Sequence, residues 1–408
     1  MSEAPAAAAA PEATVPPLAA PEAIVPPPND NEEDEDEEAY GKKRKRAVLF
    51  GYSGSGFKGL QSQVGGIAPL VAPVPGLDGE DGAEDDAKPD TVEDALHLAL
   101  FKAGAIRACN ADSFQKIGWS RSARTDRGVH AASQVIGAKL QIPGKENPPN
   151  GGDVSRVDED TMVAKVNSHL PAQIRVYRIL RVANTFNARS ATCSRTYGYF
   201  LPAFVLQREG ASQSQLLGEL RQILQEFVGT HNFHNFTEKL PPRDPRSIRI
   251  IHSFTASEEL VCEDKAMFRL TVRGQSFLKH HIRRMVGFAV ECVRRGNGHG
   301  VEMTRLSLHP FQVCIPNSHM PMAPAEALFL DSSSFEVYNA NVNSKAKLPA
   351  DAVPREHIDF ENDATVLQGR EGLISNIILP AIFSSEEGGA GAFQAFEACF
   401  CAVWNATG

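Results

Sequence analysis

The sequence is poor in the residues that build disulfide-bonded, metal-binding and membrane-spanning proteins. Its seven cysteines are scattered, odd in number and without a CxxC pair, so we expect a reducing compartment and no disulfide framework. The histidines lack zinc-ligand spacing with these cysteines, and no metal site is expected. No run of about 18 apolar residues occurs, so no membrane span is expected. The N-terminus also lacks the patterns of secretory signals and transit peptides.

Net positive charge is absent as well, but the formal charge of −9 conceals its distribution. Three acidic segments, 1–46, 78–94 and 349–408, carry −6, −8 and −7, which leaves +12 on the rest of the chain. A basic body with acidic appendages is typical of proteins that bind polyanions such as nucleic acids. Charge segregation without any binding role is the alternative interpretation.

Composition divides the chain into four parts. Residues 1–46 are Ala/Pro-rich, then acidic, then basic, and are predicted to be disordered. Two α+β lobes are expected at 47–185 and 186–345, the first interrupted by an acidic, Gly/Pro-rich loop insertion at 63–90. Residues 346–408 form an acidic C-terminal extension.

Hydrophobic periodicity and capping residues predict the regular elements of both lobes. Thr91 is placed to cap a helix, with Glu93 and Asp94 in its first turn. Strands are predicted at 133–141, 174–183, 194–202, 248–256 and 266–274. Helices are predicted at 91–104, 163–171, 213–228 and 277–294, with a further helical pattern near 391–404. This mixture indicates an α+β fold.

Two short motifs have simple explanations. "GSGFKG" at 54–59 fits a dinucleotide-binding loop, but no helix pattern follows it, and Lys58 is followed by Gly rather than Ser or Thr. A nucleotide cofactor is therefore not expected. "KKRKR" at 42–46 has the density of a nuclear import signal and predicts nuclear localisation, with the cytoplasm as a second location. A solvated charge cluster beside the first strand explains it equally well.

Basic residues gather in the second lobe. The strand predicted at 266–274 alternates Phe268, Leu270 and Val272 with Arg269, Thr271 and Arg273. "RDPRSIR" at 243–249 adds three arginines, and the helix at 277–294 has cationic residues outside its apolar stripe. These surfaces predict a groove for a phosphate backbone, and a solvated basic surface is the alternative. The residues expected to contact nucleic acid are Arg124, Arg127, Arg249, Arg273, Lys279 and Arg284.

One carboxylate stands among arginines in "SRSARTDRGVHAASQV" (120–135). Asp126 lies close in sequence to Arg121, Arg124 and Arg127. Nearby positive charge favours the ionised carboxylate, a state that suits a nucleophile and not a general acid. The sequence offers no clear second carboxylate for glycosidase-like chemistry. A structural ion pair and a phosphate-binding loop remain alternatives.

Tyr197 and Tyr199 alternate on a predicted strand, so both side chains project to one face of it. They are interpreted either as core residues or as a platform that stacks on a base.

The motifs together resemble the tRNA pseudouridine synthases, most closely the eukaryotic branch. The resemblance rests on "SARTDRGVHA" (122–131), "GYSGSGFKGLQ" (51–61), "FNARSATCSRTYGYFLPAF" (186–204), "GTHNFHNFT" (229–237), "DPRSIRII" (244–251) and "GQSFLKHHIRRMVG" (274–287). It implies a two-lobed fold with an extended, mostly antiparallel mixed sheet, flanked by helices, and a central cleft. It also implies the isomerisation of uridine to pseudouridine in tRNA, and in other RNAs as further candidates, without a cofactor, a metal or an obligate protein partner. The alternative is a non-catalytic RNA-binding protein that retains the scaffold.

The resemblance also implies roles for individual residues. Asp126 would be the nucleophile, and Arg283 would pair with it and keep it ionised. Tyr197 would stack on the target base, and Arg124 would enter the space that an extruded uridine leaves. The chain departs from the family in a loop near 320–330, where Ala325 and Ala327 replace two glycines. Substrate choice is therefore less firmly implied than the chemistry.

Overall fold

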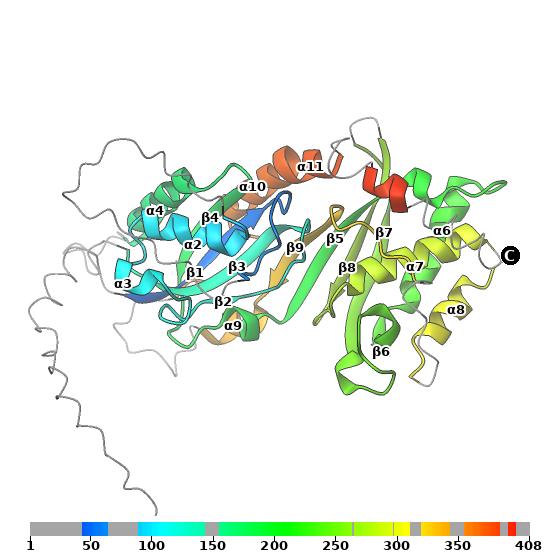
Figure 1. Ribbon diagram of the computed structural model, residues 1–408, viewed down its shortest axis with the longest axis horizontal. Coiled ribbons are helices and arrows are strands. Elements are labelled where there is room, and N and C mark those ends of the chain that lie inside the picture. The colour runs from blue at the N-terminus through cyan, green and yellow to red at the C-terminus, as the bar shows by residue number, and fades with distance from the viewer. Residues whose placement is uncertain are drawn as a thin grey trace, which may run out of the picture.

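The computed structural model describes residues 43–63, 89–142, 155–262, 265–296, 298–310, 320–342, 355–383 and 391–396 (Figure 1). Most of the N-terminal segment predicted to be disordered, of the loop insertion at 63–90 and of the last predicted helical pattern lies outside these ranges. In the described part no helix combines the length and the apolar character that crossing a membrane requires.

A single mixed sheet of nine strands organises the described residues. The strands are β1 (Arg44–Tyr52), β2 (Ser120–Arg121), β3 (His130–Leu140), β4 (Ile174–Arg181), β5 (Ser194–Pro202), β6 (Gly229–Asn232), β7 (Ile248–Cys262), β8 (Lys265–Gly274) and β9 (Leu328–Ser334). Their order is β4-β1-β3-β9-β5-β8-β7-β6, with β2 paired to β3 alone. The β3–β9 pair is parallel and the other pairs are antiparallel. The expected mostly antiparallel α+β fold is confirmed.

Strand β9 joins the two halves of the sheet. It pairs with β3 through His130 and Ala131 and with β5 along Ser194–Tyr199. In Figure 1 it lies between the half that carries β4, β1 and β3 and the half that carries β5, β8, β7 and β6. The sheet is therefore continuous across the molecule.

The helices gather beside the two halves (Figure 1). With the first half lie α2 (Val92–Lys102), α3 (Ala108–Ala111), α4 (Ser155–His169) and α10 (Ala364–Leu373), and with the second lie α6 (Gln213–Glu226), α7 (His281–Arg295) and α8 (Gly300–Ser307). The shorter helices are α5 (Ala188–Ala191), α9 (Glu336–Val342) and α11 (Leu379–Phe383), and η6 (Ile374–Ile378) is a π-helical turn. Three 3-10 turns are η1 (Ala203–Leu206), η2 (His234–Phe236) and η3 (Pro245–Ser247).

Most predicted elements are present, with corrections at some ends. Thr91 caps α2 by accepting a hydrogen bond from the Asp94 amide, as predicted. The helix predicted at 163–171 is longer and begins at Ser155. The helix predicted from 277 begins only at His281, because His280 has φ of 59°, a left-handed conformation that interrupts a right-handed helix. Strand β9 and helix α10 were not predicted.

Candidate active site

A cavity of about 860 Å³ lies beside the segment that contains Asp126. The cationic residues that line it are Lys58, Arg121, Arg124, Arg127, Arg189, Arg195, Arg249, Lys279 and Arg283. Asp126 is the one carboxylate among the described residues of its lining. The cavity therefore offers a polyanion a strongly cationic wall that contains a single acid. A second cavity of similar volume, at η1 and α6, has a mainly apolar lining and none of the predicted site residues.

The turn that presents Asp126 is held by contacts on both sides. The Val129 amide donates to the carbonyl of Asp126 at 3.1 Å, and Gly128 provides the positive φ of 81° that the turn needs. The hydroxyl groups of Tyr52 and Thr125 form a buried hydrogen bond of 2.7 Å. These contacts fix the backbone around Asp126, while its side chain remains 43% exposed toward the cavity.

The basic side chain that ion-pair geometry places beside the Asp126 carboxylate is that of His280. Its Nε2 lies 3.6 Å from Oδ2 of Asp126. The direct ion pair expected between Arg283 and Asp126 is not formed among the described residues, because Arg283 Nε donates instead to the carbonyl of Ala323 at 2.6 Å. Burial lowers the pKa of the Arg283 guanidinium, and Asp126 is among the acids that raise it. Arg283 therefore acts on Asp126 through the electrostatic field and not by contact.

His280 is in turn held by Glu238. Nδ1 of His280 lies 3.0 Å from Oε1 of Glu238, and Nζ of Lys279 lies 3.0 Å from Oε2 of the same carboxylate. The hydrogen bond from Lys279, together with the charge of His280, holds the pKa of Glu238 below its usual value. Neither Glu238 nor His280 is among the site residues predicted from the sequence. "NFTEK" and "LKHH" lie about 40 residues apart, and nothing in either predicts their contact.

Tyr197 forms part of the cavity wall. It is 6% exposed, and its ring meets Phe277 edge to face at 5.2 Å. Burial raises the pKa of the phenol to about 12, and the nearby Asp126 raises it further while Arg195 lowers it. The phenol is therefore neutral at pH 7. Tyr199, two residues along, is buried against Phe393 and does not line the cavity.

The predicted nucleic-acid contacts divide into two groups. Arg124, Arg127, Arg249 and Lys279 line the cavity with Asp126, Tyr197 and Arg283. Arg273 does not, because it points from β8 toward Glu336 and hydrogen-bonds Ser194. Arg284 does not either, because it is only 5% exposed within α7. These two residues therefore lie outside this cavity, and their contacts with RNA stay predictions. Two of the arginines that alternate along β8 pair with acids, Arg269 with Asp331 and Arg273 with Glu336, and the Arg273 side chain remains 46% exposed.

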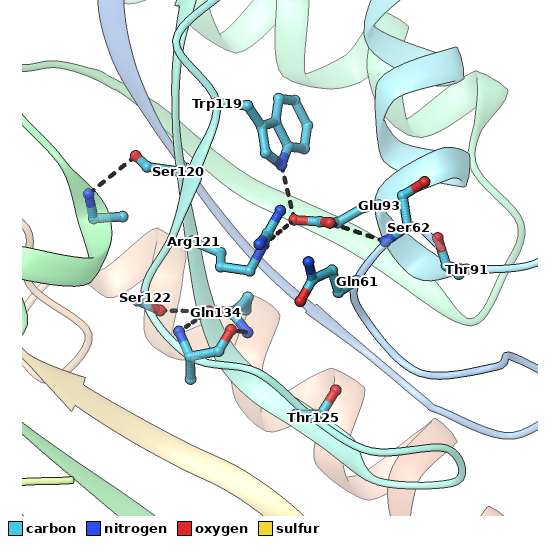
Figure 2. Close-up of polar contacts among 12 residues, drawn as sticks. Gln61, Ser62, Thr91, Glu93, Trp119, Ser120, Arg121, Ser122, Thr125 and Gln134 are labelled. Carbon is cyan, nitrogen blue, oxygen red and sulfur yellow. Dashed lines mark hydrogen bonds and ion pairs between the residues drawn. The ribbon is translucent and has the colours of Figure 1, made fainter. Parts of the chain in front are cut away.

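A buried carboxylate organises one rim of the cavity (Figure 2). Glu93, fully buried at the start of α2, accepts hydrogen bonds from Trp119 Nε1, Arg121 Nε and the Ser62 amide. Its position in the first turn also suits the positive end of the helix dipole. Glu93 thereby connects α2, the 61–63 loop and β2. The sequence analysis read Glu93 only as a favourable first-turn residue, because the depth of its burial depends on β2 packing over it.

The loop in which the family glycines are replaced approaches the same site. Ala325 and Ala327 are buried, and the Glu326 carbonyl lies 2.8 Å from Nε2 of His130. A side chain on Gly128 would meet Ala325 and Glu326 at 3.5 and 3.3 Å. The two alanines are thus accommodated beside the Asp126 turn. Within the described ranges, no three His, Cys, Asp or Glu side chains gather as metal ligands would.

Comparison with known proteins agrees with this geometry. A family model described as tRNA pseudouridine synthase matches residues 223–336. Pseudouridylate synthase 1 homologs of Mus musculus and Homo sapiens are each 32% identical, over 73% and 72% of this chain and 62% and 60% of their own length. The tRNA pseudouridine(27/28) synthase of Saccharomyces cerevisiae is 27% identical, over 73% of this chain and 86% of its own.

The fold and the site define an α+β protein with one acid in a cationic cleft. The chain resembles the tRNA pseudouridine synthases, and the similar proteins come from eukaryotes. The matched region spans about three fifths of the length of the two mammalian relatives.

Proposed function

We propose that this protein isomerises uridine to pseudouridine in tRNA, with Asp126 as the nucleophile. The observation that carries the proposal is the single carboxylate among seven arginines and two lysines in the cavity lining, with Tyr197 in the same wall. Cations of this density suit the phosphates of an RNA backbone. Three relatives named as pseudouridine synthases support the same activity.

The chemistry requires a uridine that has left its stack, because the glycosidic bond is otherwise out of reach. Asp126 attacks the nucleotide at the sugar, the N1–C1′ bond breaks, and uracil is held as an anion in the cavity. After rotation of the base, a C5–C1′ bond forms while the bond between Asp126 and the sugar breaks, and the proton lost from C5 is balanced by one gained at N1. Reactant and product are isomers, so the sequence of steps balances without an oxidant, a reductant or a second substrate.

Each residue has a defined part in this proposal. The Asp126 carboxylate is the group that attacks. The largely buried Tyr197 ring offers a π face against which uracil stacks. Arg124 is exposed at the cavity and carries no described acidic partner, so it is free to occupy the place that the extruded base vacates.

The test compares the wild-type protein with the Asp126→Asn variant on a panel of tRNA transcripts. We expect nucleoside analysis by liquid chromatography to show pseudouridine after incubation with the wild type only, with tRNA affinity changed by less than a few-fold. Binding without conversion by the wild type would identify a non-catalytic RNA-binding protein. Conversion by Asp126→Asn would remove Asp126 from the role of nucleophile.

Substrate range and localisation are further proposals. The same panel extended to other structured RNAs tests activity beyond tRNA.

Nuclear import is predicted from the basic run at 42–46, of which Arg44, Lys45 and Arg46 lie in β1 and Lys45 is 6% exposed. Microscopy of a fluorescent fusion, with Lys42 and Lys43 replaced by Ala in one variant, tests the import signal without disturbing β1.

A further inference from the structure

Backbone strain is concentrated at one contact beside the cavity. Among the described residues other than glycine, only Lys239 and His280 have positive φ, at 61° and 59°. Left-handed backbone is unfavourable for such residues and persists where the surrounding structure enforces it. Glu238, the neighbour of Lys239, touches His280 itself at 3.0 Å. Two strained positions that are about 40 residues apart in the chain therefore border the same contact.

Further interactions hold these two segments together. Thr237 Oγ1 donates to the carbonyl of Lys279 at 3.1 Å, and Lys279 Nζ lies 3.0 Å from Glu238. Arg284 Nη2, from the first turn of α7, lies 3.9 Å from the same carboxylate. The His280 side chain is only 15% exposed as a result. Its ring has Nδ1 toward Glu238 and Nε2 toward Asp126.

Asp126 has few other restraints. Its carboxylate is 43% exposed, and in the described part of the chain His280 is the one side chain within 4 Å that ion-pairs with it. A nucleophile that is misplaced by about 1 Å loses on the order of 100-fold in rate. A rigid ring beside one carboxylate oxygen limits the orientations that the carboxylate can adopt.

We propose that His280, held by Glu238, is a positioning residue that orients the Asp126 carboxylate for attack, and that the left-handed backbone at His280 serves this geometry. The inference rests on the proposed function and adds two residues to its machinery. The Glu238 carboxylate lies 3.0 Å from one ring nitrogen, and the other ring nitrogen faces Oδ2 of Asp126. Neither residue touches the substrate in this arrangement.

Three substitutions at His280 separate positioning from folding. His280→Gly removes the ring and relieves the backbone, because glycine adopts positive φ freely. We expect its melting temperature to equal or exceed that of the wild type, while kcat falls on the order of 10- to 100-fold with KM for tRNA nearly unchanged. His280→Gln carries an amide nitrogen where Nε2 stands and should recover much of kcat. His280→Asn is too short to reach Asp126 and should behave like His280→Gly.

His169→Asn is the matched control, since His169 is exposed at the end of α4 and does not line the cavity. It should retain wild-type kcat and KM. Equal kcat for wild type and His280→Gly would overturn the inference while leaving the proposed function intact. If His280→Gly, His280→Asn and His280→Gln all lose kcat equally and all have a lowered melting temperature, His280 has a structural role. That result would overturn the inference as well.

A measurement without RNA keeps the inference independent of the proposed function. The Cε1–H proton resonance of His280 is assigned as the one missing from the spectrum of His280→Gln. We expect it to move in Asp126→Asn and in Glu238→Gln, and to stay in place in Asp112→Asn, which alters an exposed carboxylate paired with Lys116. A His280 resonance that is indifferent to Asp126 would refute the contact even in an active enzyme.

Discussion

Arg121 Nε lies 2.5 Å from Oε1 of Glu93, a carboxylate that is completely buried. The pair connects β2 to α2 at the rim of the cavity, and Trp119 and the Ser62 amide share the same carboxylate (Figure 2). Removing the acid would leave a guanidinium, an indole N–H and a backbone N–H without their partner. The rim of the candidate site is thus dependent on one buried charge.

We expect Glu93→Ala to lower the free energy of unfolding by about 3–5 kcal/mol, because breaking a buried pair leaves an uncompensated charge. Urea unfolding followed by tryptophan fluorescence measures this directly, since Trp119 is a reporter at the site. The double variant Glu93→Met with Arg121→Met should recover much of the loss. Single and double variants of equal stability would show that the pair contributes little.

RNA affinity should fall steeply with salt, because each neutralised phosphate releases counterions. Arg127→Gln, at an exposed arginine of the cavity lining, is expected to reduce the slope of log K against log salt by about 0.7–0.9, the contribution of one phosphate contact. Arg273→Gln is the control, since Arg273 pairs with Glu336 outside the cavity and should leave the slope unchanged. A reduced slope for Arg273→Gln would place the RNA across β8 instead.

Tyr197→Phe separates the ring of Tyr197 from its hydroxyl. Phenylalanine keeps the π face and the edge-to-face contact with Phe277, so KM for tRNA should change by less than a few-fold. If the phenol, which burial keeps protonated, takes part in proton transfer at C5, kcat falls by about 100-fold. Wild-type kcat for Tyr197→Phe would restrict Tyr197 to stacking.

Stability should decline in mild acid because of buried neutral histidines. Burial lowers the pKa of His97 to about 4, with Asp94 opposing, and lowers the pKa of His130 to about 4 as well. In the unfolded chain these two histidines bind protons below about pH 6.5. In the folded protein they bind protons only below about pH 4. The contribution of these two histidines to the free energy of unfolding is therefore constant above pH 6.5 and falls as the pH decreases between 6.5 and 4, by about 1.4 kcal/mol per pH unit for each histidine.

His97→Phe isolates one of these contributions. Both ring nitrogens of His97 are buried without a hydrogen bond, and the ring packs on Phe114 and Trp119. Urea unfolding between pH 7 and 4.5 should show a pH slope that is smaller by about one proton in this variant. An unchanged slope would show that His97 is not the group that titrates.

Much of the fold was predictable because most strands follow simple patterns. The strand at 194–202 was located to the residue, and Phe268, Leu270 and Val272 correctly predicted β8. Strand β9 was missed because "LFLDSSS" shows little alternation, and its strand character comes from burial between β3 and β5. Such tertiary pairing overrides local preference.

The candidate site was predictable where one short motif carries it. Asp126, Arg124 and Arg127 lie within four residues, and all reach the cavity. Arg273 and Arg284 lie outside the cavity, because the charge of a strand or helix residue does not show where its side chain points. Arg273 extends to Glu336 and remains 46% exposed, and Arg284 is buried. The Glu238–His280 contact depends on two distant turns that the sequence cannot bring together.

The central place of β9 has a consequence for biosynthesis. Residues 328–334 complete the hydrogen bonding of both β3 and β5, although they follow those strands by nearly 200 and 130 residues. A nascent chain that has emerged only to the end of α8 carries two open strand edges, which are sites of intermolecular aggregation. Ribosome stalling or a premature stop before Leu328 therefore produces a chaperone client, and an N-terminal fragment expressed alone would accumulate in the insoluble fraction.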